Sequence, residues 1–183
     1  LELDEVLFVD QIMPPKVDFL DKSISYSNVD VLRESPYNLN GNGVRILQYE
    51  RKLPKNHSDF SDRLILANKY PFTGDHATYV AGILAGDGSS NSSYVGVAPL
   101  AEIIAYQYEF GGIIFYISDL INNYKSGIEE YGVSVITNSF GGNIEDDCDY
   151  YGGLYSYESA AIDSLISGKD LNKTVPVVFS IGN

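Results

Sequence analysis

The chain has 183 residues, of which 44% are apolar and 13% aromatic, so it is not a disordered chain and can form one globular domain with a sizeable core. Twelve basic residues against 25 acidic ones give a net charge of −13, which argues against nucleic acid and anionic membranes as partners. No apolar run is long enough to span a membrane, and no signal-peptide pattern stands at the start. The single cysteine, Cys148, rules out an internal disulfide.

Residues 1–36 are interpreted as an arm that packs along the surface of a domain formed by residues 37–183. In the arm, short apolar patches alternate with polar residues, and the Pro14-Pro15 pair blocks a helix through its middle. A turn-rich stretch at residues 37–43 leads into residues 44–49, whose apolar character predicts the first strand of a sheet.

Residues 74–86 predict a helix whose first turn carries the histidine His76. Val80, Ile83 and Leu84 recur at helical spacing, so we expect the body of this helix to be buried. Small residues between them would let another backbone pack close to the helix. An isolated histidine in such a place more often caps or packs than reacts, so its meaning depends on the rest of the chain.

Strands and helices alternate through the rest of the chain. Apolar runs predict strands at residues 103–108, 133–138 and 175–183, and the intervening patterns predict helices at 113–131 and 157–167. This alternation predicts an α/β fold with a doubly wound parallel sheet.

In such a sheet, chemistry is expected at the carboxyl ends of the strands. Glu50, Ser139 and Asn183 all fall at predicted strand ends, and His76 falls at a helix start.

Four segments carry motifs that occur together, in this order, in one known family. Residues 76–82 read His-Ala-Thr-Tyr-Val-Ala-Gly, and residues 96–99 read Gly-Val-Ala-Pro. Residues 133–142 contain Asn-Ser-Phe-Gly after an apolar strand, and residues 175–183 end in Gly-Asn. Together they resemble the subtilisin-like serine proteases (subtilases), over roughly residues 37–183. The resemblance implies a subtilisin-like sheet that is incomplete at its C-terminus.

The resemblance also implies three catalytic roles. His76 would be the general base, Glu50 the carboxylate that orients it, and Asn183 the side-chain donor of the oxyanion hole. In the family, a His-Pro-Asp-Leu segment follows the catalytic Asp by seven residues; His57 begins the matching segment here, and counting back seven places reaches Glu50. Glutamate adds a methylene, and Arg51 replaces the family's following glycine. Glu50 is therefore either the orienting carboxylate or an ordinary strand-end glutamate in a surface ion pair.

A second set of residues would bind the substrate. Ser139, Phe140 and Gly141 match the motif that lines the cleft, so Ser139 is not interpreted as the nucleophile. Gly111 and Gly112 would let an extended peptide lie against the backbone as an added strand.

The nucleophilic serine of the family lies in a Gly-Thr-Ser-x-Ala-x-Pro block, which does not occur in these 183 residues. We therefore expect this chain to be the N-terminal portion of a serine endopeptidase. It would be inactive alone and would require the missing C-terminal part as a partner. The alternative is a degenerate subtilase that acts as an inactive peptide-binding domain, favoured by Glu50, Arg51, Ala77 and Tyr79, which depart from the family pattern. An unrelated Rossmann-type domain would need a phosphate loop, and none occurs.

The remaining expectations concern ligands and location. Asp59 sits where some relatives supply a calcium ligand, with residues 86–93 as the matching loop. Calcium is possible, but a plain turn loop is favoured because the stretch offers few carboxylates. His57 is expected to bond nearby backbone. The resemblance implies protein or peptide substrates and a secreted or cell-surface location, with neither nucleic acid nor a membrane as partner.

Overall fold

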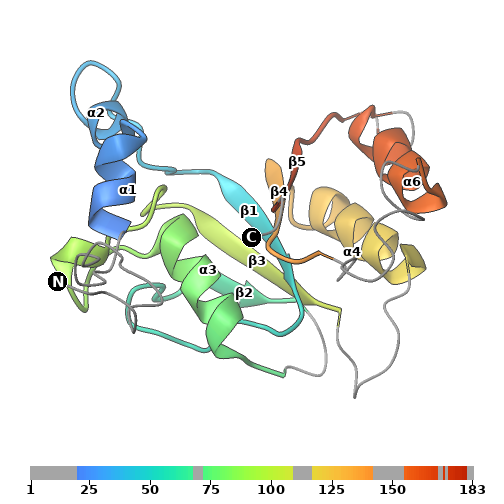
Figure 1. Cartoon of the computed structure of the whole chain (residues 1–183), viewed down its shortest axis with the longest axis horizontal. Coiled ribbons are helices and arrows are strands. Elements are labelled where there is room, and N and C mark those ends of the chain that lie inside the picture. The colour runs from blue at the N-terminus through green and yellow to red at the C-terminus, as the bar shows by residue number, and fades with distance from the viewer. Residues whose placement is uncertain are drawn as a thin grey trace, which may run out of the picture.

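The computed structural model describes residues 20–67, 72–108, 117–141, 155–168, 171 and 173–180. These residues form a parallel sheet with helices on both of its faces (Figure 1). The predicted α/β fold with a parallel sheet is confirmed.

The sheet has five strands in the order β2-β3-β1-β4-β5, and every neighbouring pair is parallel. Their bounds are β1 Arg45–Glu50, β2 Leu64–Leu66, β3 Glu102–Gln107, β4 Val135–Asn138 and β5 Val177–Phe179. The chain runs outward from β1 through its β2 and β3 side, then returns to lay β4 on the other side of β1. The strand order therefore reverses beside β1, and in open parallel sheets ligands bind outside the carboxyl ends of strands at such a point.

Side chains of β1 alternate between the two faces of the sheet. Ile46 packs in a cluster with the alanines of α3 (Asp75–Ala85), whereas Leu47 and Tyr49 pack in the cluster that holds α4 (Ile117–Glu129). Figure 1 shows α3 and α4 on either side of β1. The last five residues of β1 are all buried, as expected for a central strand of a parallel sheet that is covered on both faces.

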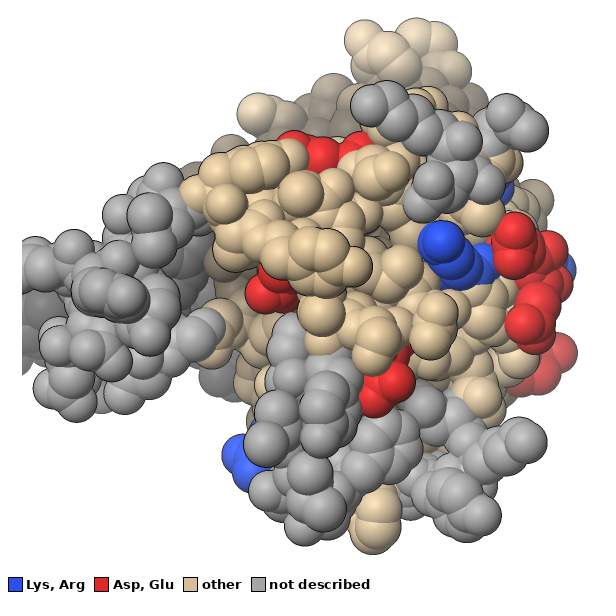
Figure 2. All heavy atoms as spheres, turned by 90° about the vertical axis from the view of Figure 1, so that its right-hand side faces the viewer, with Lys and Arg blue, Asp and Glu red and all other residues tan. Residues whose placement is uncertain are grey.

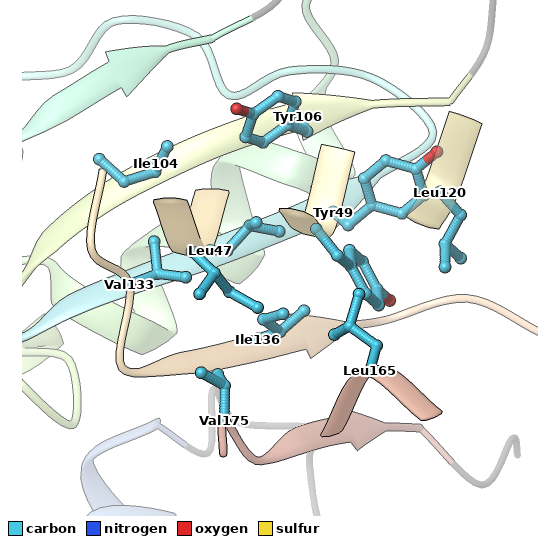
Figure 3. Close-up of a cluster of buried hydrophobic side chains, with 11 residues drawn as sticks. Leu47, Tyr49, Ile104, Tyr106, Leu120, Val133, Ile136, Leu165 and Val175 are labelled. Carbon is cyan, nitrogen blue, oxygen red and sulfur yellow. The ribbon is translucent and has the colours of Figure 1, made fainter. Parts of the chain in front are cut away.

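The larger core cluster lies on the α4 side of the sheet. Figure 3 shows Leu47, Tyr49, Ile104 and Ile136 from the strands meeting Leu120 and Leu165 from the helices. Leu165 belongs to α6 (Tyr157–Ile166), which packs beside α4. Helices α4 and α6 confirm the two helices predicted in the second half of the chain.

The helix that carries His76 is buried through its smallest residues, which corrects the expectation for its large ones. Ala77, Ala81 and Ala85 are at most 2% exposed, whereas Ile83 is 48% exposed. Alanines on the face toward the sheet let the helix backbone approach it closely, as the small residues of this segment predicted. The predicted helix is present; Leu84 packs against the buried cluster, whereas Ile83, which was expected to be buried, is exposed.

The described part of the arm is helical, which the sequence did not predict. It forms α1 (Leu20–Tyr26) and α2 (Val29–Arg33), and the guanidinium of Arg33 donates a hydrogen bond to the Gly96 carbonyl. The strand β2 and the 3-10 turn η1 (Ser92–Tyr94) were also not predicted. The boundary between an arm and a domain at residue 36 stays a prediction.

Surface charge follows the composition. On the face shown in Figure 2, acidic side chains lie at several separate places, and the coloured atoms show no broad basic patch. Within the described residues, no helix is both long enough and apolar enough to cross a membrane.

Candidate active site

The first turn of α3 is fixed by hydrogen bonds from several directions. The N-cap residue Gly74 has extended backbone, and the Thr78 hydroxyl donates to its carbonyl over 2.8 Å. The same hydroxyl accepts the Lys55 N–H, whose ammonium pairs with Asp75 at 2.5 Å. Asp75 also places a negative charge in the first turn, where the helix dipole favours it. His76, the second residue of the helix, is therefore carried on a well-defined turn.

The C-terminal end of the same helix is capped by the Gly-Val-Ala-Pro segment. The N–H groups of Gly96, Val97 and Ala98 donate to the carbonyls of Gly86, Ile83 and Leu84, each over 2.8 Å. Carbonyls at a helix end need such donors because they have no partner inside the helix. This motif, identified by resemblance alone, thus has a structural task in holding α3.

Glu50 ends β1 with its carboxylate beside the imidazole of His76. Its Oε2 lies 3.2 Å from His76 Nδ1, and its Oε1 accepts the Ser139 N–H over 2.9 Å. The glutamate side chain is 2% exposed, whereas that of His76 is 67% exposed. A buried carboxylate therefore faces an imidazole that is open to solvent on its other side.

The protonation of Glu50 depends on opposing effects. Burial raises the pKa of its carboxyl above the ordinary value, while the Ser139 N–H and the His76 imidazole favour the carboxylate and oppose that rise. Such a balance is common where a carboxylate is kept for chemistry rather than for stability.

A cleft of about 370 Å³ opens in front of this pair. Its walls include Glu50, His76 and Ser139, with the aromatic rings of Tyr108 and Phe140, whose centroids are 4.7 Å apart. The cleft therefore combines a polar pair with an apolar wall, as ligand pockets commonly do.

Most predicted site residues in the described part of the chain lie together. Glu50, His76, Ser139 and Phe140 line the cleft, and Gly141 follows them directly in the chain. The predicted sites at residues 111, 112 and 183 lie outside the described residues.

The sequence missed one contact of the site and correctly anticipated the structural place of the other histidine. The Ser139 backbone N–H holds Glu50, although only the cleft role of this segment was predicted. The strand pattern could have indicated this contact, because Glu50 ends one strand and Ser139 follows another strand of the same parallel sheet. His57 accepts the Asp59 N–H at its Nδ1 over 3.3 Å, as expected for a structural histidine.

The position considered for calcium, where a plain turn loop was favoured, holds an arginine side chain. Arg63 donates to the carbonyls of Asp59, Ala85 and Ala101, and its guanidinium lies 3.4 Å from Asp87 Oδ2. The Asp59 carboxylate accepts the Ser90 N–H over 2.8 Å. Calcium requires six or more converging oxygens, so the described donor set, already engaged by a cation of the chain itself, does not fit this ion.

The fold and the site define the class of protein: an α/β protein with an imidazole and a buried carboxylate at the point where the strand order reverses. A family model described as the subtilase family matches residues 16–183. The chain belongs to the subtilase family, a family of serine proteases.

Solved structures show the same fold. The CspB protease of Clostridium perfringens is similar at a TM-score of 0.68 and 19% identity, covering 88% of this chain and 41% of that one. The self-cleaved protease domain of PatA is similar at a TM-score of 0.58 and 22% identity, covering 79% of this chain and 52% of that one. A cold-adapted subtilisin-like serine proteinase is similar at a TM-score of 0.56 and 22% identity, covering 80% of this chain and 49% of that one. The chain thus spans about half the length of these proteins.

Proposed function

We propose that this chain supplies the general base and its orienting carboxylate to a subtilase-type serine endopeptidase. The observation that carries the proposal is the contact between Glu50 Oε2 and His76 Nδ1 at 3.2 Å, with the carboxylate buried and held by the Ser139 N–H. This contact is what a base needs in order to present its other nitrogen to a nucleophile.

In the proposed mechanism, a serine hydroxyl attacks the carbonyl carbon of the scissile peptide bond. His76 Nε2 takes the hydroxyl proton and later gives it to the leaving amine, while Glu50 holds Nδ1–H and stabilises the imidazolium. Asn183 is proposed to donate to the developing oxyanion. The serine itself is proposed to come from outside these 183 residues, because the family's Gly-Thr-Ser block is absent from them.

The substrate is proposed to be a protein or peptide in an extended conformation. Ser139, Phe140 and Gly141 would line one side of its path and Gly111 and Gly112 the other. By family resemblance we propose a secreted or cell-surface location. The mechanism requires no metal ion.

The test is reaction of the protein, in its natural full length, with a fluorophosphonate probe, read by mass spectrometry. We expect one serine to be labelled in the wild type, with labelling lost in His76→Ala. His57→Asn is the matched control: it changes the other histidine, keeps an acceptor for the Asp59 N–H, and should be labelled like the wild type. A folded wild-type protein without labelling would contradict the proposal and favour the inactive peptide-binding alternative.

A further inference from the structure

The imidazole of His76 is not held in place by packing. Its side chain is 67% exposed, and Glu50 is the partner that the structure describes for it. The distance between imidazole and carboxylate is therefore set by where the backbone of the first turn of α3 lies relative to β1.

Gln48 ties that turn to β1. It lies two residues before Glu50, so both side chains leave the strand on the same face. Gln48 is fully buried, and its Nε2 donates to the carbonyl of Ala77, the residue after His76, over 2.8 Å. Glu50 thus meets the side chain of one residue of the turn, and Gln48 meets the backbone of the next.

Gln107 ties the segment that leads into the helix. It is also fully buried and is paired with Glu50 in the register of β3 and β1. Its Oε1 accepts the Phe72 N–H over 2.9 Å, and the Leu53 N–H donates to the Phe72 carbonyl over 2.8 Å. The backbone that leads into α3 is therefore held at Phe72 through both its N–H and its carbonyl.

Burying the amide of Gln48 costs free energy that an apolar side chain at this position would not. Two of the buried residues that neighbour it on this face, Ile46 and Ala105, are apolar. In addition, Gln48 Oε1 has no hydrogen-bond partner among the described residues. A half-satisfied buried amide destabilises a core that an apolar side chain would fill, so packing alone does not account for this residue.

We propose that Gln48 and Gln107 are positioning residues that set the Glu50–His76 contact. They act through the backbone of residues 72–77 and touch no reacting atom. The inference rests on the proposed function for its purpose, but it concerns geometry and can be tested without hydrolysis.

The test uses histidine labelled with ¹⁵N and reads the tautomer of each imidazole by NMR. The chain has two histidines, and they should differ: His76 donates from Nδ1 to Glu50, whereas His57 accepts at Nδ1 and so carries its proton on Nε2. In the wild type we expect a low-field Nδ1–H resonance from His76, as a hydrogen bond to a carboxylate gives.

In Gln48→Met we expect loss of that low-field resonance and a shift of His76 toward the Nε2–H tautomer, with His57 unchanged. Gln107→Met should act in the same direction and replaces Gln48→Met if the latter does not fold. Ile128→Val, a core truncation in α4 on the opposite face of the sheet, is the control for lost stability and should leave the His76 signal unchanged.

A folded Gln48→Met or Gln107→Met variant with the wild-type His76 signal would overturn the proposal and leave the glutamines a purely structural role. Absence of the resonance in the wild type would also overturn it, because there would be no contact to position. Failure of the proposed function is a separate result: the probe could leave every serine unlabelled while the His76 signal still depends on Gln48.

Discussion

Glu50 bridges two elements with its two carboxylate oxygens. Oε1 accepts the N–H that follows β4, and Oε2 faces the imidazole on α3. The aspartate of the family pattern is one methylene shorter. The substitution of Glu for Asp therefore keeps a carboxylate at the end of β1, and the longer side chain contacts both partners.

The same residue should make stability depend on pH. Burial raises the folded-state pKa of Glu50 above its ordinary value of 4.5. The protonated Glu50 carboxyl therefore makes its full contribution to the free energy of unfolding at pH values below the ordinary pKa. This contribution is lost as the pH rises through the folded-state pKa. Glu50→Gln keeps an acceptor for the Ser139 N–H and removes the titration. We expect the variant to gain stability relative to the wild type as pH rises toward neutrality.

Urea denaturation of both proteins across this pH range measures the difference in the free energy of unfolding. A difference that stays constant with pH, or that turns in favour of the wild type, would mean that the Ser139 N–H and His76 outweigh burial.

At the scale of elements, α3 depends on the backbone that caps its C-terminal end. Gly96 packs so tightly there that a Cβ would lie 2.4 Å from the Gly82 carbonyl oxygen and 2.8 Å from the Gly86 nitrogen. Both are backbone atoms, so relief requires the segment or the helix to move. Glycine is required at this position by close approach.

Gly96→Ala should therefore lower the free energy of unfolding by about 3 kcal/mol, the upper end of the usual cost of overpacking. Gly82→Ala is the matched control within α3: apart from the backbone of its own helix turn and its chain neighbours, no described atom lies within 4 Å of its added Cβ, and alanine should raise stability by up to about 1 kcal/mol through helix propensity. Equal stabilities of the two variants in urea denaturation would contradict this account of the capping segment.

The sequence predicted elements best where the pattern is local. The apolar runs of β1 and β3 identified these strands to within one residue, since both are buried on two faces. The three-residue strand β2 is too short for any periodicity to show. In α3 the small residues correctly indicated close packing, whereas Ile83 was expected to be buried and is exposed, because apolar size alone does not report which side of a helix faces the sheet.

The site was predictable in part for the same reason. Resemblance to the family's motifs selected Glu50 and His76, and the structure places the two side chains in contact. The contact of Glu50 with Ser139 and the ties made by Gln48 and Gln107 depend on which strands are neighbours, and no local pattern contains that information.

At the scale of the whole molecule, the strand order explains why the candidate residues meet. β1 lies between β3 and β4, so residues at its carboxyl end contact segments from both halves of the chain. Glu50 comes from the middle strand, Ser139 follows the neighbouring strand, and α3 brings His76 over the sheet. The cleft is thus a product of parallel topology, as ligand sites of doubly wound sheets are.

The most direct test of the central claim is the hydrolysis of a peptide substrate by the full-length protein and by its Glu50→Gln variant. Glutamine keeps the size and the Ser139 contact but cannot stabilise an imidazolium. We predict that kcat falls by about four orders of magnitude, as it does when the orienting carboxylate of another serine protease becomes an amide. An unchanged kcat in the variant would contradict the assignment of Glu50 and remove it from the mechanism.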